Sequence, residues 1–264
     1  VCIMCKVISI VNQKGGCSKT TSAVNIGIGL ANAGKKVVLI DADAQGSLTA
    51  SLGFQKPDEL KVTLATIMAK TINEEEIDLS KVILHHEEGV DLVPGNIELS
   101  GLEVQLSNVL SRELILKEFI DSLRDFYDYI LIDCAPSLGM MTINALVAAD
   151  EVIIPVQAAY LPVKGLQQLM KTINMVKRRL NKKLQIDGIL LAMVDYRTTF
   201  ARNISAELFA AYGKSVGIFE NYIPSSIKAV EASSAGISIY KHDPKGKVAQ
   251  AYAKVTQEVL NHEN

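Results

Sequence analysis

Tryptophan is absent from this 264-residue sequence, aromatic side chains make up 5% of it, and cysteine occurs only four times. No apolar run approaches the roughly 18 residues that a membrane-spanning helix requires, which excludes a role across the bilayer. Residues 1–5 lack the charged start and long apolar stretch of a secretory signal. We therefore expect a cytoplasmic, globular protein without a membrane partner.

The cysteines do not have the spacing of a zinc site. Cys2 and Cys5 form a Cys-x-x-Cys pair, but Cys17 and Cys134 are isolated, so no second pair completes a tetrahedral set of ligands. We interpret the pair as apolar strand residues or as part of a ragged terminus, in preference to a metal or redox function.

Charge is nearly balanced overall but unevenly placed. The net charge of −2, from 27 Lys/Arg and 29 Asp/Glu, by itself argues weakly against a nucleic-acid partner. Residues 1–150, however, carry 12 basic and 20 acidic side chains (−8), whereas residues 151–264 carry 15 and 9 (+6). This asymmetry predicts a face that attracts anions, and the competing interpretation is a set of ordinary solvated lysines.

Short runs rich in valine and isoleucine alternate with helical patterns along the chain. Such runs are typical of strands buried on both faces of a sheet, and their alternation with helices predicts an α/β fold with a doubly wound, mostly parallel sheet. No linker or repeat interrupts the pattern, so we expect a single domain over residues 1–264. The predicted strands are residues 6–11, 36–41, 90–93, 129–133, 151–156 and 184–194, and the predicted helices are residues 20–33, 112–126, 165–180, 205–212 and 247–260.

A glycine-containing loop follows the first predicted strand and leads directly into a helix. It reads Asn-Gln-Lys-Gly-Gly-Cys-Ser-Lys-Thr-Thr over residues 12–21. Such a loop cradles phosphate with backbone N–H groups, so we expect Lys19 to reach the β- and γ-phosphates and Thr20 to hold Mg²⁺. The generic Gly-x-x-x-x-Gly-Lys-Ser/Thr pattern is not met, because Gln13 and Ser18 occupy its glycine positions.

The order of residues in this loop resembles the deviant Walker A motif of the ParA/MinD ATPase family, in which a lysine such as Lys14 directly precedes two glycines. The resemblance implies ATP as the ligand and a homodimer in which Lys14 reaches the partner's nucleotide. Ser18 replaces the family's usual glycine, and a positive φ there would add strain of roughly 1–2 kcal/mol. Lys14 and Lys19 are then also catalytic, and the implied nucleotide contacts are Lys14, Gly15, Gly16, Cys17, Ser18, Lys19, Thr20 and Thr21.

Two further predicted strands end in acidic residues. Asp41 and Asp43 lie at the end of the second strand and Asp133 ends the fourth, which is where α/β sheets hold their ligands. These segments resemble the family's Asp-x-Asp-Pro-Gln-Gly switch, with Ala44 in place of proline, and its Walker B strand. The resemblance implies that Asp43 activates the attacking water and that Thr20, Asp41 and Asp133 support Mg²⁺. A helix-capping role is the alternative for Asp41 and Asp43.

The resemblance covers nearly the whole chain, including its C-terminal half. The blocks around Asp195 and Pro224 resemble the family's contacts with the nucleotide base. Arg197 and Lys228 match positions that bind DNA without sequence preference. Lys228 stands where arginine is usual, which keeps the charge but loses the planar fork of the guanidinium.

The resemblance implies a dimerising ATPase switch for chromosome or plasmid partition. ATP binding would drive dimerisation, the dimer would bind non-specific DNA at the nucleoid, and slow hydrolysis, stimulated by a ParB-like centromere-binding partner, would release it. The sequence starts at its first predicted strand, so it resembles the short, Soj-like branch, and we expect no separate N-terminal DNA-reading domain.

Three other functions compete with this hypothesis. A MinD-like membrane switch needs an amphipathic lipid-binding helix, whereas residues 247–260 favour a helix packed on the sheet. A nucleotide-gated binding protein with negligible hydrolysis is suggested because Ser18, Ala44 and Ala159 depart together from the family pattern; Lys164 also replaces a usual acid. A metabolic ligase or reductase on the same scaffold is the third.

Overall fold

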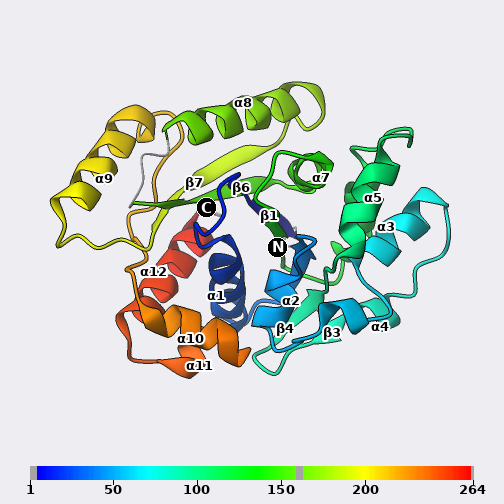
Figure 1. Cartoon of the computed structure of the whole chain (residues 1–264), viewed down its shortest axis with the longest axis horizontal. Coiled ribbons are helices and arrows are strands. Elements are labelled where there is room, and N and C mark those ends of the chain that lie inside the picture. The colour runs from blue at the N-terminus through cyan, green and yellow to red at the C-terminus, as the bar shows by residue number, and fades with distance from the viewer. Residues whose placement is uncertain (1–4, 159–162, 263–264) are drawn as a thin grey trace.

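The computed structural model of the chain describes residues 5–158 and 163–262. Seven strands form one sheet in the order β3-β4-β2-β5-β1-β6-β7. Every neighbouring pair is parallel except β3 and β4, which are antiparallel. The predicted doubly wound, mostly parallel sheet is therefore confirmed (Figure 1). The strands are β1 Lys6–Ile10, β2 Val37–Ala42, β3 Leu84–His85, β4 Val90–Val93, β5 Tyr129–Cys134, β6 Glu151–Gln157 and β7 Gln185–Ala192.

Helices connect the strands and cover both faces of the sheet. The described part of the chain contains no helix long and apolar enough to cross a membrane. The α-helices are α1 Lys19–Asn32, α2 Ser47–Ser51, α3 Leu64–Ile72, α4 Leu79–Val82, α5 Glu98–Leu106, α6 Ile115–Leu123, α7 Met140–Ala148, α8 Val163–Arg179, α9 Thr199–Tyr212, α10 Ile227–Ala235, α11 Ile239–His242 and α12 Lys247–Asn261, and one 3₁₀ turn spans Pro57–Glu59.

Alternating side chains of the strands divide the core into two apolar layers. On β2, Val38 and Ile40 face the layer that α3 and α5 to α9 cover, whereas Val37 and Leu39 face the layer of α1, α2 and α10 to α12. Figure 1 shows these groups of helices on opposite sides of the sheet. Because both faces are buried, the strands are continuous apolar runs in the sequence.

The C-terminal helix packs on α1, as its sequence pattern favours. The residues at helical spacing on α12 are buried in the same layer as the apolar face of α1, and the Tyr252 hydroxyl lies 3.2 Å from the Ser22 hydroxyl. This inward face is therefore covered by protein. The residues that α12 buries are Val248, Ala249, Tyr252, Val255, Thr256 and Val259.

The parallel register brings three strand ends together at one edge of the sheet. Asp133 on the central strand β5 is paired with Ile10 on β1 and with Asp41 on β2. The loop after β1 therefore begins beside both acidic residues. This alignment positions the site described next.

Candidate nucleotide-binding site

The loop after β1 is anchored to the sheet by Asn12. The Asn12 side chain is 8% exposed, its Nδ2 donates to the Pro155 carbonyl at 2.7 Å, and its Oδ1 accepts from the Lys14 amide at 3.0 Å. One side chain thus fixes the loop to β6 and orients its first turn. Sequence reasoning passed over Asn12, because the available signal was only an asparagine between a strand and a glycine loop, and its burial appears only in the structure.

The loop surrounds the ammonium group of Lys19, and its outer side is open. The Lys19 side chain lies inside the loop, where its Nζ donates to the Lys14 carbonyl at 3.1 Å, and the residue is 7% exposed. A Cβ atom added at Gly15 or Gly16 would meet nothing within 4 Å, so there is open space over both backbone units. Cys17 is buried and its Sγ donates to the Lys14 carbonyl, so it offers only its backbone outward.

Ser18, which replaces the family's usual glycine, has a left-handed backbone conformation with positive φ. Its φ of 70° and ψ of 25° place it in the αL region at the start of α1, and its side chain makes no capping hydrogen bond. A Cβ in this region adds roughly 1–2 kcal/mol, and nothing in the local hydrogen bonding offsets that strain. Ser18 is therefore a strained position inside the loop.

Ser18→Gly should raise the free energy of unfolding by about 0.5–1 kcal/mol. Relief of the αL strain outweighs the greater backbone entropy that glycine has in the unfolded chain. Chemical denaturation would measure this gain, and calorimetric titration should find ATP affinity unchanged or tighter. A clear loss of affinity would instead mean that the serine side chain contributes a ligand contact of its own.

The first residues of α1 meet the end of β5 at a buried carboxylate. The Thr20 hydroxyl donates to Asp133 Oδ2 at 2.7 Å, while Asp133 Oδ1 is buried with no hydrogen-bond partner among the described residues. Burial, followed by repulsion from Asp41, raises the pKa of the Asp133 carboxyl to about 8. A divalent cation beside Thr20 and Asp133 would supply both the missing partner and the compensating charge, so these residues fit Mg²⁺.

Asp41 is equally buried but its oxygens are already occupied. Its Oδ2 accepts from the Thr49 amide at 2.8 Å and from the Thr49 hydroxyl at 2.7 Å, and its Oδ1 accepts from the Asp43 amide at 3.3 Å. Burial raises the pKa of the Asp41 carboxyl to about 6, and the bonds from Thr49 oppose that rise. These contacts tie the end of β2 to α2, and of the two carboxylates Asp133 is the better fit to a cation.

Asp43 lies in the turn that leads from β2 to α2. Its Oδ1 accepts from the Gln45 amide at 3.0 Å, its carbonyl accepts from the Gly46 amide at 3.0 Å, and its side chain is half-buried. Gly46 has φ of 59° and packs against Pro57, so this tight turn requires glycine there. The turn holds the Asp43 carboxylate at the same edge of the sheet as Asp133.

The segment after Asp133 is held by a residue that sequence reasoning missed. Glu103 on α5 accepts from the Met141 amide in the first turn of α7 at 3.3 Å. A carboxylate at this helix end is favourable because the N-terminus of α7 carries a partial positive charge. Gly139 packs directly against the same carboxylate, and a Cβ there would collide with it. An isolated glutamate on a helix carries no signal of this long-range contact.

The C-terminal blocks lie at the same edge, beyond β6. Val194 forms a bridge with Pro224, which brings the segment of Asp195 beside that of Pro224 at the end of β7. Asp195 accepts two bonds from the Arg197 guanidinium, at 2.8 and 2.7 Å, and this pairing lowers the pKa of the Asp195 carboxyl to about 2.

The predicted DNA-contacting residues lie outside the cluster of Lys19, Thr20 and Asp133. Arg197 remains exposed although it pairs with Asp195, and Lys228 pairs with Glu231 at 2.8 Å on α10. Of the departures from the family pattern, Ala159 and the side chain of Lys164 lie outside what the structure describes.

Comparisons with known proteins agree on the family. The sequence profile of the AAA domain matches residues 5–186. The sporulation initiation inhibitor protein Soj of Bacillus subtilis is 40% identical, with 97% of this chain and 98% of Soj covered. The chromosome partitioning protein ParA of Caulobacter vibrioides is 36% identical, with 98% and 95% covered.

One solved structure with the same fold is named as a metabolic enzyme and not as a partition protein. Cobyrinic acid a,c-diamide synthase from Mycobacterium smegmatis, with bound ADP and magnesium, has a TM-score of 0.86 at 33% identity and covers 98% of this chain and 96% of its own. Both the sequence relatives and this structure align over nearly their full lengths. The chain therefore belongs to the ParA/MinD-type P-loop ATPase family, together with the Soj and ParA partition proteins.

Proposed function

We propose that this chain acts as one P-loop domain that binds ATP with Mg²⁺, dimerises around it and hydrolyses it slowly in DNA partition. The observation that carries the proposal is the hydrogen bond from Thr20 to the buried Asp133, which leaves one carboxylate oxygen without a partner among the described residues, next to the loop that holds the Lys19 ammonium. A cation bound to Thr20 and Asp133 would give the free carboxylate oxygen a partner, and phosphates bound at the loop would pair with the Lys19 ammonium. The relatives' names, Soj and ParA, support partition as the setting.

Each residue of the site would then have a distinct task. The amides of the loop and the Lys19 ammonium bind the phosphates, and Thr20 and Asp133 hold the cation. Mg²⁺, when bound, neutralises charge that develops on the phosphate oxygens. Asp43 orients the attacking water and accepts its proton. Lys14 reaches the nucleotide of the partner subunit, which makes dimerisation depend on ATP.

In its ATP-bound form, the dimer binds nucleoid DNA in the cytoplasm without sequence preference. The charge of +6 over residues 151–264 supports a phosphate-contacting face, and Arg197 and Lys228 are its candidate residues. A ParB-like centromere-binding protein would stimulate hydrolysis. Because α12 buries its apolar residues against α1, no free apolar face on that helix supports membrane insertion.

DNA co-sedimentation in four nucleotide states tests the proposal. The protein would be spun with duplex DNA without nucleotide, with ADP, with ATP and with a slowly hydrolysed ATP analogue. Binding should be restricted to the two ATP-type states, because only those states favour the dimer. Equal binding in all four states, or in none, would contradict a DNA-partition switch.

A second candidate function is amide synthesis in metabolism, which the name of the M. smegmatis structure favours. Such an enzyme would use ATP to activate a carboxylate substrate and would have no reason to bind DNA in a nucleotide-dependent way. The same co-sedimentation therefore separates the two functions. Phosphate release that required an added carboxylate and an amide-nitrogen donor would favour the synthase.

Arg197→Ala should weaken binding similarly on all DNA sequences and reduce the slope of log K against log salt. Each neutralised phosphate contributes about 0.9 to this slope, and a symmetric dimer presents Arg197 twice, so the expected reduction is roughly 2. Arg202→Ala, at a nearby exposed position on α9, is the matched control. If Arg197→Ala instead lowered the melting temperature and left the slope unchanged, its pairing with Asp195 would be structural.

A further inference from the structure

The positive charge of the C-terminal half is concentrated in one segment. Residues 152–186 contain seven Lys/Arg and no Asp/Glu, whereas the rest of residues 151–264 contains eight Lys/Arg and nine Asp/Glu. The surplus of +6 in this half therefore comes entirely from that segment. Arg197 and Lys228 belong to the remainder, where acids balance the bases.

Most of this charge lies on the outer side and C-terminal end of α8. The inner side buries Leu166, Leu169, Met170, Ile173 and Val176, while the basic side chains of the described part are exposed. None of them forms an ion pair with a described acid. Three lie in the last turn, where they also favour the helix dipole, but two others follow the helix and have no such role. The exposed basic residues are Lys171, Lys177, Arg178, Arg179, Lys182 and Lys183.

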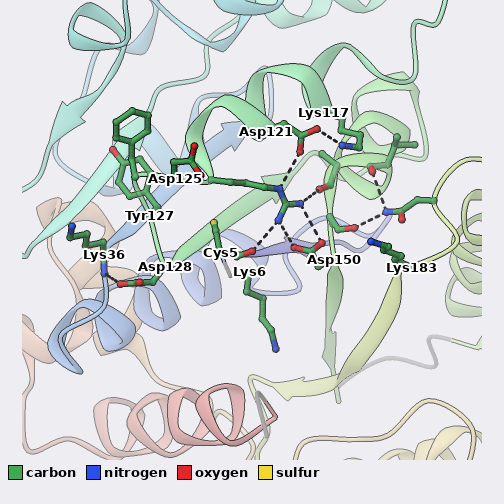
Figure 2. A pocket seen from close by; sticks show the side chains of 16 residues that line it. Cys5, Lys6, Lys36, Lys117, Asp121, Asp125, Tyr127, Asp128, Asp150 and Lys183 are labelled. Atoms are coloured by element: carbon green, nitrogen blue, oxygen red, sulfur yellow. Dashed lines mark hydrogen bonds and ion pairs between the residues drawn. The ribbon is translucent and has the colours of Figure 1, made fainter. Parts of the chain in front are cut away.

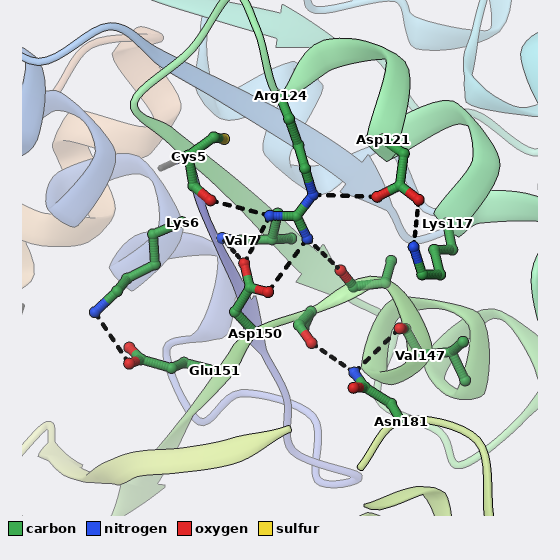
Figure 3. A network of polar contacts seen from close by, with 12 residues as sticks. Cys5, Lys6, Val7, Lys117, Asp121, Arg124, Val147, Asp150, Glu151 and Asn181 are labelled. Carbon is green, nitrogen blue, oxygen red and sulfur yellow. Dashed lines mark hydrogen bonds and ion pairs between the residues drawn. The ribbon is translucent and has the colours of Figure 1, made fainter. Parts of the chain in front are cut away.

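The loop after α8 is held in place, so its lysines are presented from a fixed backbone. Asn181 Nδ2 lies within donating distance of the carbonyls of Leu146, Val147 and Ala149, at 3.1, 3.1 and 2.6 Å (Figure 3). These contacts attach the loop to the end of α7. Lys182 and Lys183 follow immediately, so their backbone has little freedom to lose when a polyanion binds.

In the cavity beside Lys183, most cations are paired with carboxylates, unlike the exposed basic residues at the end of α8. Lys183 lies at one side of a cavity of about 890 Å³, and Lys36 lies at the other side (Figure 2). The three remaining cations of the cavity lining are paired with carboxylates. Arg124 binds Asp150 at 2.9 Å and Asp121 at 3.1 Å, Lys117 pairs with Asp121, and Lys6 pairs with Glu151 at 3.0 Å. An anion entering the cavity would compete with these carboxylates. The favourable place for phosphate is therefore the end of α8.

We propose that the C-terminal end of α8 and its following loop form a phosphate-contacting surface for duplex DNA. This α8 basic surface consists of Lys177, Arg178, Arg179, Lys182 and Lys183. It adds to Arg197 and Lys228, whose charges are offset by Asp195 and Glu231, and it rests on the DNA binding proposed above. An anionic membrane is the less favoured partner, because Met175 and Leu180 are the only large apolar residues exposed on the described side chains of α8 and the loop after it, and two isolated side chains do not form a lipid-inserting face.

A charge-matched pair of triple variants tests the surface. The test variant is Lys177→Gln, Arg179→Gln, Lys182→Gln, and the control is Lys214→Gln, Lys245→Gln, Lys254→Gln, which removes the same charge at exposed positions elsewhere. Glutamine keeps helix propensity close to that of lysine and arginine. The readout is duplex-DNA affinity with ATP analogue between low and moderate salt, with melting temperature and ATP affinity measured alongside.

The test variant should lose at least tenfold in DNA affinity at low salt, with a salt slope smaller by about 0.9 for each phosphate contact removed. ATP affinity should be unchanged, and the control should bind DNA nearly as the unaltered protein does. Equal losses in test and control would overturn the inference, because the effect would then be one of net charge. Full DNA affinity in the test variant, or loss only of binding to phosphatidylglycerol vesicles, would overturn it as well. If the unaltered protein bound no DNA in any nucleotide state, the proposed function itself would fail.

Discussion

Lys19→Ala should reduce ATP affinity by about 10²-fold to 10⁴-fold. Lys19 is 7% exposed, and its Nζ is already positioned inside the loop by the Lys14 carbonyl. Two charge-assisted hydrogen bonds to phosphate, at about 1.5–3 kcal/mol each, account for a loss of this size. Isothermal titration with ATP and Mg²⁺ would measure it directly.

Two controls separate ligand binding from folding. Lys61→Ala removes an exposed lysine away from the loop and should leave ATP affinity unchanged. Thermal unfolding of Lys19→Ala without nucleotide should be close to that of the unaltered protein, since the substitution removes one hydrogen bond to the Lys14 carbonyl and one long contact with Cys17 Sγ at 4.0 Å. ATP affinity within a few-fold of normal in Lys19→Ala would contradict the assignment of this loop as the phosphate cradle.

The buried parts of the sheet are predictable from sequence because burial on both faces leaves an apolar run. Each of the six predicted strands corresponds to a strand of the structure within two residues at either end. The missed strand β3 spans only Leu84–His85 at an antiparallel edge, where no long apolar run forms. The helix predicted at residues 205–212 instead begins at Thr199, because Thr198 caps it by accepting from the Ala201 amide.

The order of the site residues along the chain is also readable from sequence, but their partners are not. Lys19, Thr20 and Asp133 follow strand ends, and parallel register brings such ends together. The bonds from Thr49 that occupy Asp41, and the contact of Glu103 with α7, join elements far apart in sequence. No local pattern encodes them, so they emerge only when the helices pack.

Residue counts do not predict which charged side chains on the surface are paired. The count alone gives +6 for the C-terminal half and does not separate paired from unpaired side chains. Arg197 lies two residues from its acid partner, and Lys228 three residues from its own, so both pairs follow from local backbone geometry. The acid nearest in sequence to the basic residues at the end of α8 is Asp187, four residues after Lys183, and Asp187 pairs with His262.

Asp43→Ala should leave ATP binding and dimerisation intact while lowering turnover by about 10²-fold to 10⁴-fold, the usual contribution of a general base. The protein would then accumulate in its ATP-bound, DNA-bound state. Asp43 is suited to this role because the turn after β2 fixes its backbone while its side chain remains half-exposed. Single-turnover phosphate release would measure the loss, and light scattering would detect the dimer.

Asp43→Asn is the decisive companion, because the alternative role of Asp43 is to hold its turn. Asparagine keeps an oxygen that can accept from the Gln45 amide, as Asp43 Oδ1 does at 3.0 Å, but it cannot accept a proton from water. If Asp43 is the base, both variants lose turnover to a similar extent and retain ATP affinity. If Asp43 only shapes the turn, Asp43→Asn hydrolyses ATP at nearly the normal rate while Asp43→Ala does not. Normal turnover in both variants would move the water-activating role to another residue.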